Sequence, residues 1–177
     1  MNLILIGYRG TGKSTLARLL AEKLGWEWID ADVEIERRAG KSIARIFAED
    51  GEPAFRDLEA SVIAELCRRD RLVLAAGGGA PLRPETRHVM RQSGQVVWLT
   101  ARPETIHARM SGDATTASRR PSLTNKPAME EIVHLLAQRE PAYRQCAHVT
   151  IDTEAKSPEV LVAEILQAVR LQLGGAV

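Results

Sequence analysis

The chain has 177 residues, of which 45% are hydrophobic and 27% charged, with a formal net charge of +1. These values are typical of one globular domain with a sizeable core, and a charge near zero gives no support for bulk attraction to nucleic acid or to a membrane surface. No apolar run approaches the ~20 residues of a membrane span. The first residues lead directly into a predicted strand, so we expect no signal peptide. The cysteines Cys67 and Cys146 are expected to be free thiols, which indicates the cytoplasm.

A strand, a glycine-rich loop and a helix are predicted at the start of the chain. Leu3–Ile6 is a short apolar strand, and from Ser14 to Gly25 apolar residues recur at helical spacing. Between them, Gly7–Ser14 fits the pattern G-x-x-x-x-G-K-[ST], whose backbone N–H groups hold phosphates at a helix N-terminus. We therefore expect the loop to bind a nucleoside triphosphate; a glycine turn that binds nothing is disfavoured by the flanking strand and helix. The ATP-binding residues expected here are Gly10, Thr11, Gly12, Lys13, Ser14 and Thr15, with Lys13 at the β- and γ-phosphates and Ser14 on magnesium.

Strands and helices alternate along the rest of the chain. Further strands are predicted at Trp26–Asp30, Leu72–Ala75, Val96–Leu99 and His148–Ile151. Helices are predicted at Asp32–Arg38, Ile43–Glu49, Phe55–Arg69, Pro84–Arg91, Pro103–Arg109, Pro127–Tyr143 and Pro158–Leu173. This alternation favours a parallel sheet covered by helices on both faces. No repeat or linker interrupts it, so we expect a single α/β domain over residues 1–177.

One segment differs from the others. Residues 110–126, MSGDATTASRRPSLTNK, are small and polar and lack apolar periodicity. A loop of this length in a compact domain is commonly a lid over a functional site or a disordered segment. Because a spacer does not need the adjacent arginines Arg119 and Arg120, we expect a lid here.

Candidate site residues follow the predicted strands, at the end of the sheet where open α/β folds bind ligands. The second strand ends in Asp30 and Asp32, one of which could serve a metal while the other faces a second substrate. Alternatively, Asp32 caps the next helix. The third strand ends in Gly77–Gly79, which allows close approach of a ligand to the backbone or forms a bare tight turn. Since this strand carries no Asp at its end, help with the metal is expected from Ser14 and Asp30.

Two arginines, Arg56 and Arg139, could be either structural or ligand-binding residues. Arg56 precedes Glu59 by three positions, so the two share a helix face and could form a solvated ion pair. Arg139, in QREPAYR, could be a helical surface arginine. Near a phosphate site, however, two guanidinium groups could together hold a carboxylate.

In their order and approximate spacing these motifs resemble those of the shikimate kinase family. The resemblance covers the chain from the first strand to the last helix, and several motifs in order are far more specific than any one alone. The motifs are the loop Gly7–Ser14, DAD at Asp30–Asp32, IF…GE..FR..E from Ile46, GGG at Gly77–Gly79, RRP at Arg119–Pro121 and REPAYR from Arg139. The resemblance implies a three-layer P-loop fold with a five-stranded parallel sheet in the order 2-3-1-4-5, substrate-binding helices at about 32–62 and a flexible lid at about 110–126. It also implies the reaction of ATP with shikimate to give ADP and shikimate 3-phosphate, a step toward chorismate and the aromatic amino acids, with Mg²⁺ as cofactor.

The resemblance also implies roles for individual residues. Asp32 is similar to the aspartate that meets the shikimate hydroxyls and accepts the 3-OH proton, and Asp30 to the one that holds magnesium through water. Arg120 is similar to the lid arginine over the phosphates, which with Lys13 and Asp32 completes the catalytic set. Substrate contacts are implied for Arg56, Arg139, Gly78 and Gly79, pocket-lining or bracing roles for Phe47, Phe55 and Glu59, and ATP contacts for Arg109 and for Lys156 in the adenine loop Ile151–Pro158. We expect a monomer whose partners are ATP and shikimate, without nucleic acid or membrane.

Other functions remain open at this level. A gluconate-type small-molecule kinase would share the fold and the loop Gly7–Ser14, but has less reason to keep the other motifs together. A regulator that binds shikimate or ATP without turnover would normally show a damaged catalytic residue, whereas Lys13, Asp32 and Arg120 are all present. A GTPase is excluded because TNKPA, the only near match to N-K-x-D, has Ala128 in place of the Asp. The family often has Arg-Pro-Leu-Leu where this chain has RPSL, after a longer polar stretch, so the role of Arg119 is left open.

Overall fold

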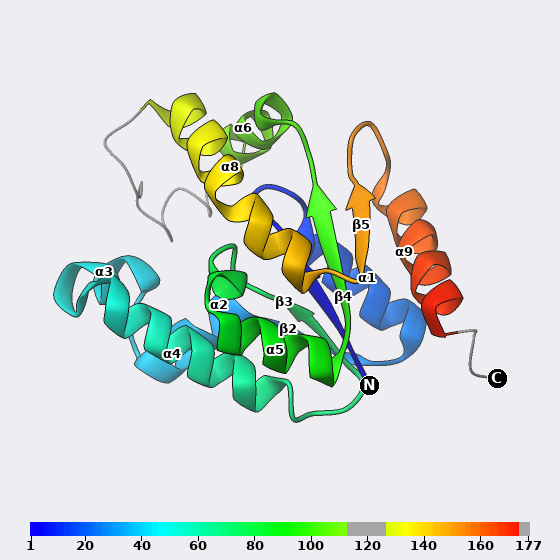
Figure 1. The fold of residues 1–177 in the computed structure, drawn as a ribbon, viewed down its shortest axis with the longest axis horizontal. Helices are drawn as coiled ribbons and strands as arrows, with labels where there is room; N and C mark the ends of the chain where they lie inside the picture. Colours follow the sequence, from blue (N-terminus) through cyan, green and yellow to red (C-terminus); the bar gives the residue numbers. More distant parts are fainter. Residues whose placement is uncertain (113–126, 174–177) are drawn as a thin grey trace.

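Five parallel strands form the centre of the structure, in the order β2-β3-β1-β4-β5 (Figure 1). The computed structural model describes residues 1–112 and 127–173, with side chains as far as residue 170. The expected strand order is confirmed, with Leu5 of β1 lying between Ala75 of β3 and Val97 of β4. The strands are β1 (Asn2–Ile6), β2 (Glu27–Asp30), β3 (Leu72–Ala75), β4 (Gly94–Thr100) and β5 (Val149–Asp152).

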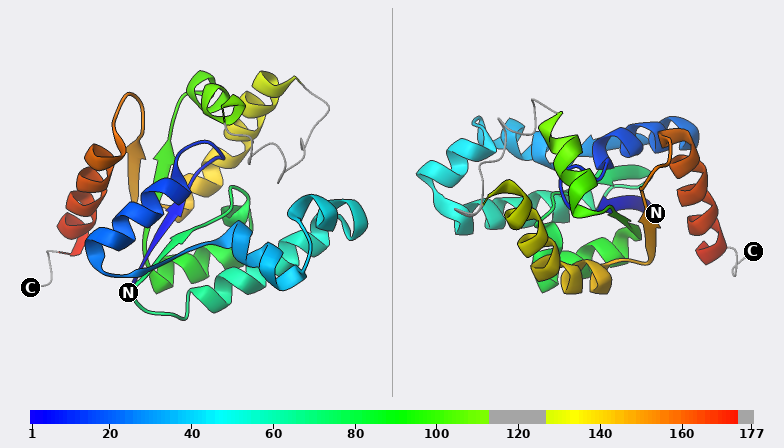
Figure 2. Two further views of the ribbon diagram at one scale, coloured as in Figure 1. Left: turned by 180° about the vertical axis from the view of Figure 1, so that it is seen from behind. Right: turned by 90° about the horizontal axis from the view of Figure 1, so that it is seen from above.

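Helices cover both faces of this sheet and make three layers (Figure 2). Leu3 and Leu5 of β1 pack toward α1 and α9, whereas Ile4 and Ile6 pack in the cluster formed with α2, α4, α5 and α8. This alternation follows from the two-residue period of a strand. The helices are α1 (Lys13–Leu24), α2 (Ala31–Ala39), α3 (Ile43–Glu49), α4 (Gly51–Leu66), α5 (Pro84–Ser93), α6 (Pro103–Ser111), α8 (Ala128–Cys146) and α9 (Pro158–Leu173), with a short 3₁₀ helix, η1 (Ala80–Leu82). Among these described helices, none has the length and apolarity to cross a membrane.

Both ends of the helix predicted at Phe55–Arg69 were wrong. Helix α4 begins at Gly51 rather than Phe55, since Pro53 lies in its first turn, where a missing N–H costs nothing. It ends at Leu66 rather than Arg69, because the N–H groups of Arg68 and Arg69 turn back to carbonyls three residues earlier. The first two residues of the predicted lid, 110 and 111, belong to α6; residues 113–126 lie outside the described residues.

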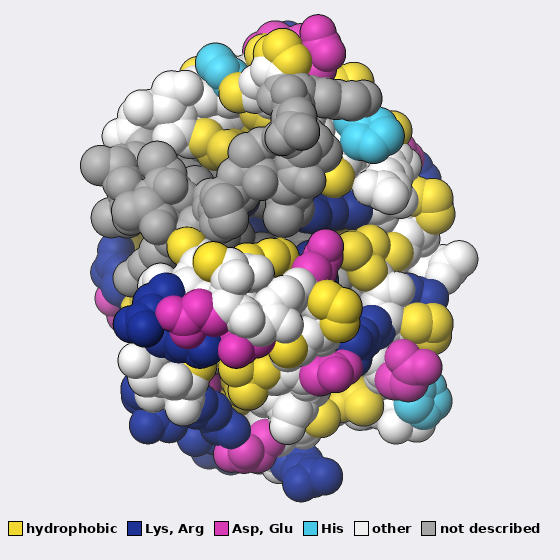
Figure 3. All heavy atoms as spheres, turned by 90° about the vertical axis from the view of Figure 1, so that its left-hand side faces the viewer, with side chains coloured by type: hydrophobic (Ala, Val, Ile, Leu, Met, Phe, Trp, Pro, Cys, Tyr) yellow, Lys and Arg dark blue, Asp and Glu magenta, His cyan; other side chains and the backbone are white. Residues whose placement is uncertain are grey.

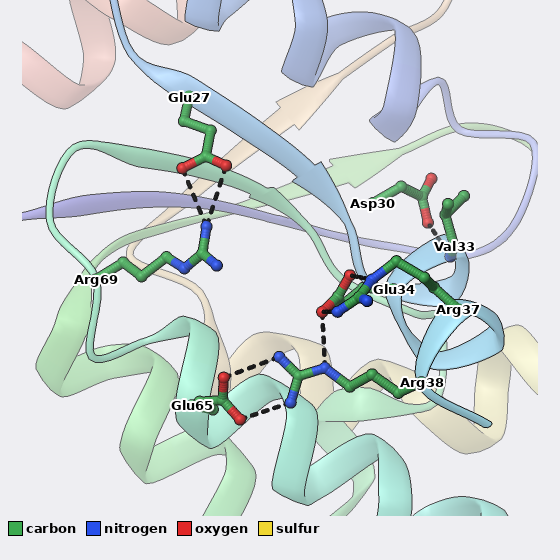
Figure 4. Close-up of polar contacts among 8 residues, drawn as sticks. All are labelled: Glu27, Asp30, Val33, Glu34, Arg37, Arg38, Glu65 and Arg69. Carbon is green, nitrogen blue, oxygen red and sulfur yellow. Dashed lines mark hydrogen bonds and ion pairs between the residues drawn. The ribbon is translucent and has the colours of Figure 1, made fainter. Parts of the chain in front are cut away.

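An ion-pair network joins α2 to α4 (Figure 4). The Glu34 carboxylate accepts hydrogen bonds from Arg37 Nε at 2.8 Å and from Arg38 Nε at 2.7 Å. Arg38 also donates two hydrogen bonds to Glu65 of α4. Hydrogen bonds from Arg37 and Arg38 lower the Glu34 pKa to about 2. The network therefore ties together the helices that carry Asp32 and Arg56.

We expect Glu34→Gln to destabilise the protein by about 1 kcal/mol at pH 7, a small value because the arginines are partly exposed. The Glu34 pKa falls from 4.5 in the unfolded chain to about 2 in the folded one, so its contribution is complete above pH 4.5 and is lost as the pH falls toward 2. Urea unfolding of both proteins from pH 7 to pH 3 measures this. The difference between them should shrink toward low pH, and a constant difference would refute a role for the Glu34 charge.

Candidate active site

The loop between β1 and α1 has the geometry of a phosphate-binding loop. Gly12 is the N-cap residue of α1 and has a φ of 91°, a backbone conformation that residues other than glycine rarely adopt. The Lys13 ammonium group lies across the loop and donates to the carbonyls of Gly7 and Tyr8, both at 2.9 Å. The Thr11 hydroxyl also donates to the Tyr8 carbonyl, at 2.7 Å. Helix α1 thus begins at the carboxyl end of the sheet, and the N–H groups of its first turn can stabilise an anion there.

Ser14 and Asp30, the two residues predicted to serve the metal, lie in contact beside this loop. The Ser14 hydroxyl donates to Asp30 Oδ2 at 2.5 Å. The other oxygen of Asp30, Oδ1, accepts from the backbone N–H group of Asp32. It also accepts from the backbone N–H group of Val33 (Figure 4). Asp30, not Asp32, is thus the N-cap of α2, because the extended backbone at Asp30 directs its carboxylate to the first turn of the helix. Asp32 lies in that first turn, half-buried, and the alternative that it serves as the cap was wrong.

The Arg56 guanidinium lies against the glycine turn after β3. A Cβ atom at Gly79 would lie 2.1 Å from Arg56 Nη1, so a larger residue would displace the guanidinium from this position. Arg56 donates to Glu59 at 2.7 Å and to Glu52 at 3.0 Å. Arg56 and Glu59 are 8% and 2% exposed, so the predicted ion pair is present but is not solvated. The glycine turn is therefore not a bare turn, because a buried guanidinium packs against it.

Arg139 approaches the same turn from α8. Its Nη1 atom would lie 3.4 Å from a Cβ at Gly78, and its guanidinium carbon is 5.6 Å from the centre of the Tyr8 ring. Arg139 is 5% exposed, which excludes a surface role. Within the described residues its Nε has no hydrogen-bond partner, and no carboxylate forms an ion pair with its guanidinium. The structure thus brings two arginines, 83 positions apart in number, to adjacent glycines.

Aromatic side chains lie next to this group. The rings of Phe47 and Phe55 are 4.7 Å apart, and the Arg56 guanidinium lies 5.2 Å from the centre of the Phe55 ring. Phe55 is fully buried and Phe47 partly so. Figure 3 faces this end of the molecule; hydrophobic side chains run across its middle, and Lys and Arg side chains show in the recess beside them. The arrangement suits a small ligand with an apolar ring and anionic groups.

On the nucleotide side, Arg109 links the phosphate loop to the segment after β5. Its guanidinium donates to the Gly10 carbonyl at 3.4 Å and to the Thr153 carbonyl at 2.9 Å. Lys156 lies in the same segment and pairs with Glu164 of α9 at 2.7 Å. Arg120 and Arg119 lie outside the described residues.

Three further residues take part in these contacts and were not predicted from the sequence. Glu52 pairs with Arg56, Thr153 holds Arg109, and the Tyr143 hydroxyl donates to the Gly78 carbonyl at 2.6 Å. For Glu52 and Tyr143 a signal existed, because each stands four positions from a predicted arginine on the same helix. Thr153 lies in the implied adenine loop Ile151–Pro158, but no pattern marked this residue itself.

Known proteins match this chain over nearly its full length. A sequence profile described as shikimate kinase matches residues 9–170. The chain belongs to the shikimate kinase family. A shikimate kinase from Rhodopirellula baltica is 47% identical over 99% of this chain and 94% of its own, and one from Symbiobacterium thermophilum is 44% identical over 94% and 95%. A solved shikimate kinase from Acinetobacter baumannii, in complex with shikimate, has a TM-score of 0.89 at 39% identity, covering 99% of this chain and 94% of that one.

Membership of the shikimate kinase family agrees with the expected fold and separates this chain from other P-loop kinases. A gluconokinase from Sinorhizobium meliloti superposes with a TM-score of 0.64 but is only 17% identical. That likeness is one of fold alone. The shikimate kinase relatives, by contrast, align with this chain in sequence over nearly its full length.

Proposed function

We propose that this member of the shikimate kinase family transfers the γ-phosphoryl group of ATP to the 3-hydroxyl of shikimate. The observation that carries the proposal is the buried pair Arg56 and Arg139 on the glycine turn, at the same end of the sheet as the phosphate loop. One side of this site suits the phosphates of ATP. The other suits a small acid with hydroxyl groups.

The charges on the two arginines favour a carboxylate ligand. Arg56 is offset by Glu59 and Glu52, whereas Arg139 is buried with no acidic partner among the described residues. A buried charge without a counter-ion is costly. The planar guanidinium can meet a carboxylate with two parallel hydrogen bonds. Binding of the shikimate carboxylate would therefore satisfy Arg139.

The oxygen atoms of Ser14 and Asp30 fit magnesium. They already lie in contact at the mouth of the phosphate loop, and hard cations such as Mg²⁺ prefer oxygen ligands, retaining several waters. The described residues hold no cluster of three or more His, Cys, Asp or Glu side chains that could bind a metal by themselves. We infer that Ser14 and Asp30 would hold Mg²⁺ together with the nucleotide phosphates. When bound, the ion supplies neutralisation of phosphate charge.

The residues of the chain then perform the transfer by positioning and by electrostatics. Asp32 orients the 3-hydroxyl and accepts its proton, since its half-buried carboxylate stands at the first turn of α2. Lys13 stabilises charge that develops on the transferred group. We propose the same role for Arg120 and a water-excluding role for the segment that contains it. Phosphoryl transfer needs little covalent chemistry from the protein, so these roles suffice.

We expect Arg139→Lys to raise the KM for shikimate at least tenfold, with a much smaller effect on the KM for ATP. Lysine keeps the charge but loses the planar fork that pairs with a carboxylate. Steady-state kinetics with each substrate varied in turn measures this. Arg144→Lys is the matched control, because Arg144 lies on the same helix but is exposed and paired with Glu140. If only the KM for ATP rose, Arg139 would belong to the nucleotide site and the assignment would be wrong.

The position of phosphorylation has its own test. In ³¹P–¹H correlation spectra of the product, we expect the phosphorus to couple to the proton on carbon 3 of shikimate; coupling to another ring proton would refute the proposed acceptor.

As part of the same proposal we place the enzyme in the cytoplasm as a monomer. The free, buried state of Cys67 and Cys146 supports a reducing compartment. A mass of twice 19.5 kDa in light scattering would contradict the monomer.

A further inference from the structure

The Tyr143 hydroxyl makes a contact that the proposed mechanism does not use. It donates to the Gly78 carbonyl at 2.6 Å, a short and fully buried hydrogen bond between α8 and the turn after β3. The turn itself is held by few bonds: Ala80 N–H donates to Gly77, and Leu82 N–H to Gly79. Three consecutive glycines have more backbone freedom than any other triplet. An outside contact is therefore needed to fix the peptide between Gly78 and Gly79.

Peptide planarity extends the effect of this bond by one residue. In a trans peptide the carbonyl of one residue and the N–H of the next point in opposite directions within one plane. All peptide bonds between described residues are trans. By holding the Gly78 carbonyl, Tyr143 therefore sets the direction of the Gly79 N–H. No hydrogen bond from this N–H to another described residue is found, and it lies beside the Arg56 guanidinium.

Tyr143 is itself rigidly held. It is 0% exposed, and its ring packs on Trp98 of β4 with the ring centres 5.6 Å apart. It stands one helical turn after Arg139, so the two side chains share a face of α8. Both reach Gly78, Arg139 through Nη1 and Tyr143 through its hydroxyl. Helix α8 thus delivers a guanidinium and a hydrogen-bond donor to the same turn.

We propose that Tyr143 is a positioning residue for the acceptor substrate: its hydroxyl holds the Gly78–Gly79 peptide so that the Gly79 N–H donates to a substrate hydroxyl oxygen. This inference rests on the proposed function, because the acceptor is taken to be shikimate. Tyr143 does not touch the substrate. It acts through the peptide that does.

The test is Tyr143→Phe, which removes only the hydroxyl. We expect the KM for shikimate to rise about fivefold, the value of one neutral hydrogen bond. The kcat and the KM for ATP should change less than twofold, since the lost contact is one made equally in the ground state and the transition state. Replacement of Tyr143 by 4-aminophenylalanine, which keeps a donor at the same position, should restore the KM for shikimate to within twofold. This second variant also tests the positioning role of Tyr143 if the phenylalanine variant does not fold.

A matched control separates positioning from loss of stability. At the opposite end of the sheet, the Asn2 side chain donates to the Arg69 carbonyl and accepts from the Leu72 N–H group, and Asn2→Ala removes both hydrogen bonds. It should lower the melting temperature at least as much as Tyr143→Phe, yet leave the KM for shikimate unchanged. A change below twofold in Tyr143→Phe, an equal rise in both KM values, or failure of the 4-aminophenylalanine variant to restore the KM would overturn the inference. Failure of the wild-type protein to phosphorylate shikimate would instead refute the proposed function.

Discussion

Replacement of Lys13 by alanine is expected to lower kcat by about a thousandfold or more, the scale of losing a principal charge-stabilising donor. The ammonium group lies within 2.9 Å of two carbonyls of the phosphate loop, so it is held where the β- and γ-phosphates of ATP would bind. Alanine leaves the backbone N–H groups of the loop in place but removes the charge. Single-turnover and steady-state assays at saturating ATP and shikimate measure the loss.

Lys23→Ala is the matched control for this variant. Lys23 lies in the last turn of the same helix, α1, and is exposed. The control should keep the wild-type kcat, which shows that loss of a lysine from α1 is not itself harmful. A near-normal kcat in Lys13→Ala would show that the loop Gly7–Ser14 does not bind the transferred phosphate.

Asp32→Asn is expected to lower kcat by roughly a hundredfold or more, the usual scale of a positioned general base, with little change in ATP affinity. Asparagine keeps the size of the side chain but cannot accept the proton of the attacking hydroxyl. Since the proton leaves late in a loose transition state, the loss also includes the orientation of the hydroxyl. Asp57→Asn serves as control, because Asp57 is an exposed aspartate of α4 whose partner is Arg83.

Asp30→Asn should differ from Asp32→Asn in its response to magnesium. Asn caps helices as well as Asp does, so α2 should remain capped in this variant. Its weaker activity should be partly restored by added Mg²⁺, because Asp30 acts through the metal. A magnesium titration of both variants at saturating substrates separates the roles. Rescue of Asp32→Asn but not of Asp30→Asn would mean that the two roles are reversed.

Patterns confined to one segment were enough to predict several parts of this site. The loop Gly7–Ser14 and the helix after it follow from their glycines, lysine and helical spacing. The placement of Ser14 and Asp30 at one end of the sheet follows from the rule that open α/β folds bind ligands there, but their direct hydrogen bond was not predicted. The order of the strands came from the family resemblance, since alternation of strands and helices allows several orders. The structure confirms it.

Features that depend on packing could not be predicted in this way. Asp30 and Asp32 both lie at the boundary between β2 and α2, and only the backbone angles at Asp30 decide which of them caps the helix. The burial of Arg56 arises because α4 packs on the turn after β3, so its spacing to Glu59 indicated the ion pair but not its exposure. The hydrogen bond from Tyr143 to Gly78 joins distant segments, which no local pattern reveals.

The most direct test of the proposed function is ADP release by the purified wild-type protein with ATP, Mg²⁺ and one acceptor at a time. We expect saturable ADP release with shikimate, and release near the acceptor-free background with gluconate and with quinate. Quinate shares the carboxylate and several hydroxyls, so it tests the geometry of the site, whereas gluconate tests the wider class of P-loop kinases. Turnover of gluconate above that of shikimate, or binding of shikimate without any ADP release, would contradict the account.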